Sequence, residues 1–104
     1  MITVATIRED LRDIKYYCAR KKMFEEASAR VGQSSVLEKV ETYNKCICEA
    51  PPRLYDIYVS LYLTGNSQDS LAEYLGYSVE YISKLNSQLI RYFQTHLGKE
   101  REAQ

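Results

Sequence analysis

Residues 68–87, QDSLAEYLGYSVEYISKLNS, decide the fold of this chain. Two short amphipathic segments flank a glycine there, which is typical of two helices folded across a tight turn, a helix-turn-helix. Gly76 falls at the turn, where glycine reaches a positive φ at little steric cost. Ala72 falls where the two helices approach most closely, so a larger side chain would push them apart. The positions expected to share the core between these helices are Leu71, Leu75, Tyr77, Ile82 and Leu85.

The segment before this motif predicts a further short helix. Apolar residues from Leu54 onward recur at helical spacing, and Gly65 is expected to end this helix as a left-handed cap. Asn66 or Ser67 then caps the next helix, which runs through Leu75. Three-helix packing of this shape serves DNA binding, and it also occurs in protein-interaction modules.

The last predicted helix is the second helix of the motif. Ser78 is expected to cap its start, and its apolar face extends to His96 or Leu97 before Gly98 ends it. The tail over residues 99–104 is charged and has no apolar anchor, so it is expected to fray.

The N-terminal part of the chain also has helical periodicity. A helix is predicted from about Thr3 to Ala29, bent near Lys21 and ended by Gly32. Its apolar stripe could be a self-association seam, or it could belong to the core of the monomer. The second interpretation is favoured, because two heptads are too short to hold a coiled coil. The stripe consists of Val4, Ile7, Leu11, Ile14 and Cys18.

A second N-terminal helix is predicted over residues 35–49, because Ser35 and Glu38 form a capping-box pattern. Pro51 and Pro52 end it, since neither can donate the backbone hydrogen bond of a helix. No run alternates with period two, so strands are not expected. The chain is therefore predicted to be all-α, with about five helices in three parts: a helical pair over residues 1–50 for packing or dimerisation, a helix-turn-helix unit over 51–98, and a frayed tail over 99–104.

The charge balance weighs against tight, non-specific DNA binding by a monomer. The chain of 104 residues holds 14 basic and 14 acidic side chains, so its net charge is zero. Residues 51–104 hold five basic and six acidic side chains. Phosphate neutralisation supplies most non-specific affinity for DNA, and here the motif lacks that support. A homodimer would compensate, because two copies read paired half-sites.

The exposed face of the last helix is the candidate DNA-reading surface. In a helix-turn-helix the second helix enters the major groove with its N-terminal residues against base edges. Glu80 could accept from a cytosine amino group, Val79 could pack on a thymine methyl, and Lys84 could reach guanine or phosphate. The alternative is an ordinary solvated helix face. The candidate DNA-binding residues are Gln68, Ser78, Val79, Glu80, Ser83, Lys84, Ser87 and Arg91.

Arg20, Lys21 and Lys22, supported by Lys15, form the densest basic cluster. It could contact phosphate beside the main motif. The competing interpretation is a helix surface in which these lysines pair with glutamates four residues later, and this interpretation is favoured.

Signatures of catalysis, metal binding and membrane insertion are lacking in the sequence. His96 is the single histidine and is expected to be a dipole partner near a helix C-terminus. Cys18, Cys46 and Cys48 have no zinc-ligand spacing and are expected to be reduced thiols. With no glycine-rich phosphate loop, signal peptide or long apolar run, the sequence predicts a cytoplasmic protein that is no enzyme and holds no cofactor or metal.

Two stretches carry a resemblance to known proteins. Leu54-Tyr-Asp-Ile-Tyr and Gly65 through Leu85 resemble the fourth conserved region of bacterial sigma-70-type factors and small phage or prophage regulators that activate late or packaging genes. Leu11-Arg-Asp-Ile-Lys-Tyr-Tyr, Tyr43-Asn44 and Ala50-Pro-Pro-Arg-Leu-Tyr are similar to short, largely uncharacterised proteins of Gram-positive bacteria and their phages.

The resemblance implies that the helix from Ser78 is a recognition helix and that the helix before it is its support. The chain has no room for the other regions of a sigma factor, so a complete sigma factor is not expected. Recognition helices of that family begin with several arginines and lysines, whereas this one offers Glu80 and Lys84.

The leading hypothesis is a phage-type transcriptional regulator that binds double-stranded DNA. The alternative is an adaptor that docks on RNA polymerase or another phage protein without reading DNA. A packaging adaptor such as a small terminase subunit is a third possibility, and it would form a ring oligomer.

Overall fold

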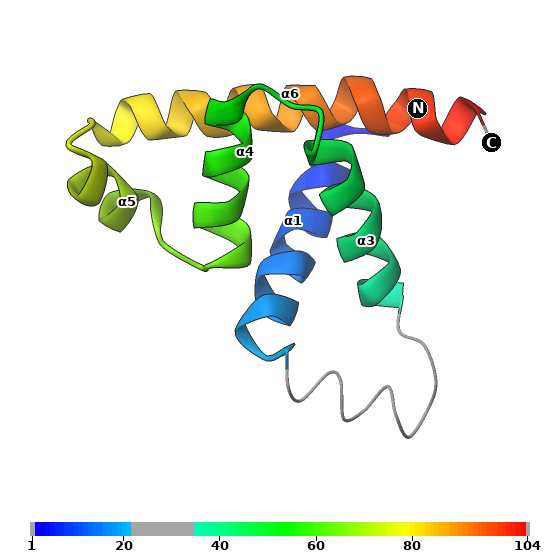
Figure 1. The fold of residues 1–104 in the computed structure, drawn as a ribbon, viewed down its shortest axis with the longest axis horizontal. Coiled ribbons are helices and arrows are strands. Elements are labelled where there is room, and N and C mark those ends of the chain that lie inside the picture. Colours follow the sequence, from blue (N-terminus) through cyan, green and yellow to red (C-terminus); the bar gives the residue numbers. More distant parts are fainter. Residues whose placement is uncertain (1, 22–34, 104) are drawn as a thin grey trace.

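The computed structural model describes residues 2–21 and 35–103 of the chain. These residues form α-helices and one short π-helix, with no strand among them, which confirms the predicted all-α class. The elements are α1 (Val4–Ala19), α3 (Ser35–Ile47), α4 (Pro52–Tyr58), the π-helix η1 (Val59–Leu63), α5 (Gln68–Leu75) and α6 (Val79–Ala103) (Figure 1).

The long helix α6 is the axis of the fold. In Figure 1 it spans the top of the molecule, while α1, α3 and α4 descend from it on one side and α5 lies near its N-terminal end. It contacts α1, α3, α4 and α5. Both N-terminal helices therefore pack on the same helix as the C-terminal ones.

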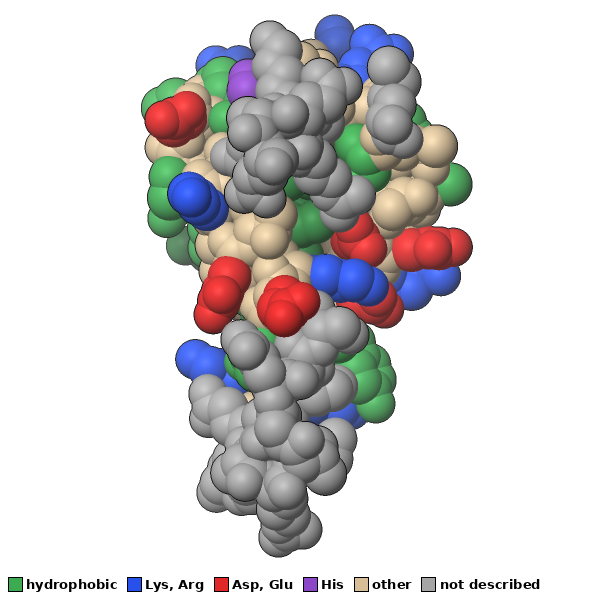
Figure 2. Space-filling view, turned by 90° about the vertical axis from the view of Figure 1, so that its right-hand side faces the viewer, with side chains coloured by type: hydrophobic (Ala, Val, Ile, Leu, Met, Phe, Trp, Pro, Cys, Tyr) green, Lys and Arg blue, Asp and Glu red, His purple; other side chains and the backbone are tan. Residues whose placement is uncertain are grey.

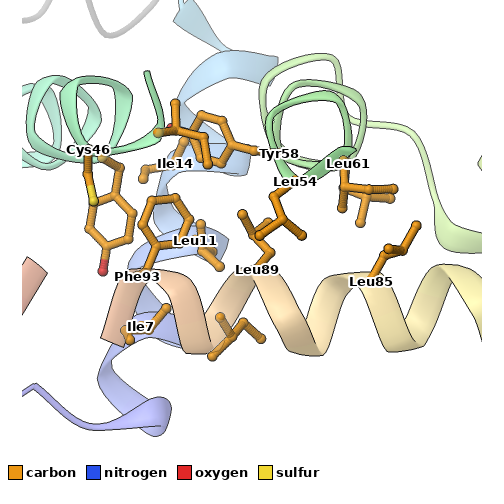
Figure 3. Close-up of a cluster of buried hydrophobic side chains, with 14 of the residues drawn as sticks. Ile7, Leu11, Ile14, Cys46, Leu54, Tyr58, Leu61, Leu85, Leu89 and Phe93 are labelled. Carbon is orange, nitrogen blue, oxygen red and sulfur yellow. The ribbon is translucent and has the colours of Figure 1, made fainter. Parts of the chain in front are cut away.

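The core lies between α6 and the helices beneath it. Its largest fully buried side chains are aromatic: the ring centroid of Phe93 lies 4.8 Å from that of Tyr43 and 5.5 Å from that of Tyr58. Ile7, Leu11 and Ile14 of α1 are fully buried in the same cluster. The cluster also holds Leu54, Leu61, Leu85 and Leu89 (Figure 3). This part of the N-terminal stripe thus packs into the core of its own chain, whereas Val4 is exposed.

A buried carboxylate joins α1 to α3. Asp10 is 5% exposed, and the Tyr43 hydroxyl donates to its Oδ2 atom at 2.7 Å. The Lys39 ammonium lies 3.4 Å from Asp10 Oδ1 and 3.0 Å from Asp13 Oδ2. The hydrogen bond to Asp13 is the largest effect on the pKa of Lys39 and raises it, against partial desolvation. The hydrophobic periodicity gave no reason to expect Asp10 inside.

The N-terminal helix is interrupted at the predicted bend near Lys21, since Arg20 forms a turn and Lys21 is helical again. α1 stops at Ala19, where Arg20 leaves the helical backbone (φ −128°, ψ 33°) and its N–H donates to the Tyr17 carbonyl at 3.0 Å. The apolar stripe that α1 buries also ends here, so packing no longer holds the helix in register. The predicted continuation to Ala29 and the stop at Gly32 lie outside the described residues.

Other helix boundaries differ in detail. α3 ends at Ile47 rather than Glu49, and Ser35 is its first helical residue rather than its cap. The predicted stop at Gly98 is wrong, because α6 continues to Ala103. A helical glycine costs about 1 kcal/mol relative to alanine. The residues after it are mostly good helix formers, so the helix continues past this cost.

The π-helix was not predicted. Thr64 N–H donates to the Val59 carbonyl, five residues back, at 2.8 Å. Within the π-helix, the Tyr62 hydroxyl donates to Oδ1 of Asn86, a buried residue of α6. Gly65 follows with φ 84°, which confirms its predicted left-handed conformation.

Candidate nucleic-acid interface

The turn between α5 and α6 is built from the residues that predicted it. Gly76 has φ 74°, and its N–H donates to the Glu73 carbonyl at 3.4 Å. Tyr77 N–H donates to the Ala72 carbonyl at 2.9 Å. This pair of bonds is the Schellman arrangement, which satisfies the last carbonyls of a helix. Ala72 is buried, as expected of the point where the two helices meet.

The starts of α5 and α6 each have a serine cap. The Ser67 hydroxyl accepts from Ser70 N–H at 3.1 Å, and the Ser78 hydroxyl accepts from Tyr81 N–H at 3.1 Å. Both caps confirm the sequence-based expectation. They also satisfy backbone donors that would otherwise be unpaired at the helix ends.

Two of the apolar positions expected to lie between α5 and α6 are instead exposed. Leu75 is 44% and Tyr77 49% exposed, whereas Leu71, Ile82 and Leu85 are buried. Both exposed residues flank Gly76, where the left-handed turn carries the chain away from the contact between the helices. The Tyr77 ring packs on the Tyr81 ring instead, with centroids 5.0 Å apart.

The candidate residues of α6 share one outer face. Its inner face is buried through Ile82, Leu85 and Leu89. Gln68 stands apart from the outer face, because it is the first residue of α5 and is half-buried. The candidate residues that are exposed, at or following the α6 cap, are Ser78, Val79, Glu80, Ser83, Lys84, Ser87 and Arg91.

The outer face carries little net positive charge. Lys84 and Arg91 are its cations, seven residues apart on one helical stripe, and Glu80 is its carboxylate one turn before Lys84. Two phosphate contacts supply only a small part of the affinity that DNA-binding proteins draw from counterion release. The outer face therefore needs further contacts for tight binding.

A groove of about 310 Å³ lies next to this face. The Arg53 guanidinium donates to the Tyr81 hydroxyl at 2.9 Å on its wall. No pattern in the sequence indicated this groove. The groove is lined by Arg53, Tyr55, Asp56, Ile57, Val59, Ser60, Leu75, Tyr77, Tyr81 and Leu85.

The histidine and the cysteines are not gathered into a site. His96 lies inside α6 rather than at its C-terminal end, with its ring stacked on Tyr92 at 4.0 Å. The three cysteines are free thiols, and burial raises the pKa of Cys18. In the part of the chain that the structure describes, no three metal-ligating side chains gather, and no helix is both long and apolar enough to span a membrane.

No family model, curated protein or solved structure matches the chain.

Proposed function

We propose that this chain is a DNA-binding transcriptional regulator of phage or prophage type that reads duplex DNA through the outer face of α6. The observation that carries the proposal is the division of this helix into two faces. Ile82, Leu85 and Leu89 are buried, while the polar side chains opposite them are exposed over more than three turns. A helix anchored along one face and bare along the other fits the major groove.

The exposed side chains supply complementary chemistry. Val79 offers an apolar contact for a thymine methyl, and Glu80 an acceptor for a cytosine amino group. Lys84 has the reach for guanine or phosphate, and Arg91 lies two turns further along for the backbone. Gln68 is half-buried, so its contribution is limited to a phosphate near the start of α5.

The proposal is tested by titrating the chain into a labelled duplex pool prepared from bacterial genomic DNA, at several salt concentrations. Lys84→Ala and Arg91→Ala are each expected to weaken binding. Each should also make the plot of log binding constant against log salt concentration less steep by about 0.9, the value for one lost phosphate contact. Lys45→Ala is the control, because Lys45 is an exposed cation on α3, away from this face. Absence of binding to every duplex at low salt would rule out the proposal.

The groove favours a second candidate function, docking on RNA polymerase without reading DNA. Its walls include apolar and aromatic side chains that a protein partner would cover, and Tyr55, Leu75 and Tyr77 are exposed there. Tyrosine is enriched at protein interfaces because it buries a large ring at a small entropic cost.

This candidate is tested with purified RNA polymerase from a Gram-positive bacterium, in the absence of DNA. Tyr77→Ala is expected to weaken the complex by roughly tenfold or more, as expected for an interface anchor. Tyr74→Ala is the matched control, because Tyr74 is 86% exposed on α5 but does not line the groove. Equal binding by both variants, or no complex with the unsubstituted chain, would contradict docking through the groove.

A further inference from the structure

We infer that an exposed cationic stripe on α1, formed by Arg8, Arg12 and Lys15, binds the phosphate backbone of the duplex that α6 reads. The inference rests on the proposed function, and it supplies the positive charge that the outer face of α6 lacks. It shares only Lys15 with the basic cluster around Arg20.

The three cations form a continuous stripe because their spacing follows the helix. Arg12 is four residues after Arg8, and Lys15 is three after Arg12, so all three lie on one face over about 10 Å of helix axis. All three are exposed, whereas Ile7, Leu11 and Ile14 on the neighbouring face are fully buried. The core therefore fixes the orientation of the stripe.

The cations of the stripe are not held in ion pairs, although the exposed carboxylate of Glu9 lies between Arg8 and Arg12 in the sequence. Among the described residues, none of its three cations forms an ion pair, since the ion pairs of α1 join Lys39 to Asp10 and Asp13. Lys39 of α3 thus partly neutralises the carboxylates of Asp10 and Asp13 on the side of α1 that meets α3. By contrast, the face at the right-hand side of Figure 1 shows cationic and acidic side chains interspersed (Figure 2).

The stripe lies on a helix that packs against α6. α1 contacts both α6 and η1. The Gln94 side chain of α6 donates to the Ile2 carbonyl, two residues before α1, at 3.5 Å. These contacts hold the N-terminal end of α1 beside the helix that would face DNA.

The added charge changes the expected salt dependence. With Lys84 and Arg91 alone, the log–log slope would be about −1.8, whereas five contacts give about −4.5. Between about 50 and 200 mM salt, the smaller slope costs roughly tenfold in affinity and the larger one several hundredfold. The two cases are easily distinguished.

The test compares two variants that lose equal charge. Arg12→Gln/Lys15→Gln removes two stripe cations, and Arg20→Gln/Lys45→Gln removes two exposed cations that lie off the stripe. Binding of a short labelled duplex of arbitrary sequence is measured for the full chain at several salt concentrations. For the stripe variant, the plot of log binding constant against log salt concentration should be less steep by about 1.8. The control variant should have the same slope as the unsubstituted chain.

The two proposals fail in different ways. If the unsubstituted chain binds duplex DNA and both double variants keep its slope, the stripe inference is overturned while the function of α6 stands. If the unsubstituted chain binds no duplex, both are overturned. Arg12→Lys/Lys15→Arg keeps the charge and is expected to keep the slope, and circular dichroism verifies that every variant is folded.

Discussion

At the scale of single residues, the polar groups inside the core explain how α1 is held in one orientation. A buried carboxylate is tolerated only when it is paired and hydrogen-bonded. Asp10 satisfies this condition through Tyr43 and Lys39, which both belong to α3. The position of α1 therefore depends on two side chains of the other N-terminal helix.

Removing the Tyr43 hydroxyl should destabilise the fold. Tyr43→Phe leaves the buried Asp10 carboxylate without its 2.7 Å donor. We expect the free energy of unfolding to fall by roughly 1–3 kcal/mol, measured by urea denaturation. Tyr55→Phe removes a hydroxyl from an exposed ring and should stay within about 0.5 kcal/mol of the unsubstituted chain. An equally small change for Tyr43→Phe would show that the hydrogen bond contributes little.

The buried tyrosines should make the fold sensitive to alkali. Burial raises the pKa of Tyr58 and Tyr62 in the folded chain, whereas an unfolded tyrosine titrates near 10. The unfolded state therefore loses these protons first, so this contribution to stability is intact below about pH 10 and is lost as the pH rises further. Each such tyrosine lowers the free energy of unfolding by up to about 1.4 kcal/mol per pH unit in that range.

Urea denaturation between about pH 9 and 11 checks this expectation, since the range spans the ordinary tyrosine pKa. Tyr58→Phe should lower stability at neutral pH, because the hydroxyl donates to Asn44 Oδ1 at 2.7 Å. It should also flatten the alkaline slope. An unchanged slope in this variant would mean that Tyr58 does not contribute to it.

At the scale of elements, the sequence predicted the caps and turns that depend on backbone bonds between near neighbours. Ser67, Gly76 and Ser78 act through backbone bonds to near neighbours, so the sequence alone revealed them. The π-helix and the continuation of α6 past Gly98 depend on packing or on a balance of small propensities. No local pattern carries that information.

The same distinction applies to the candidate site. The exposure of the α6 face followed from helical periodicity, because its inner apolar stripe was visible in the sequence. The groove depends on how α4 approaches the turn between α5 and α6, and the exposure of Leu75 and Tyr77 depends on the path of the chain after Gly76. These are tertiary features, so they became apparent only with the structure.

The conformation of Gly76 should set the stability of the turn. Gly76→Ala should lower the free energy of unfolding by about 1–2 kcal/mol, because a left-handed backbone strains a side chain. The strain is conformational, since no heavy atom beyond Gly76 and its two chain neighbours lies within 4 Å of the position that Cβ would take. Gly76→Asn is the control and should lose less, because asparagine tolerates this region. Equal losses, measured by thermal denaturation, would contradict this explanation.

At the scale of the whole molecule, one core connects the N-terminal and C-terminal helices. Residues of α1, α3, α4, η1, α5 and α6 all belong to the same buried cluster. We therefore expect a single cooperative unfolding transition, with helical circular dichroism and tyrosine fluorescence giving coincident urea curves. A fragment of residues 51–104 should not fold alone, because it lacks the α1 side chains that cover Tyr58 and Phe93. Two separated transitions would contradict this expectation.

The continuity of α6 links binding to folding. One side of the helix is packed in the core and the other is the proposed contact for DNA, so a ligand held there is bound only by the folded chain. Such a ligand at one hundred times its Kd would add about 2.7 kcal/mol to the free energy of unfolding. Affinity and melting temperature should then rise together, and a thermal-shift screen of nucleic acids would detect ligands of this helix without knowledge of their sequence.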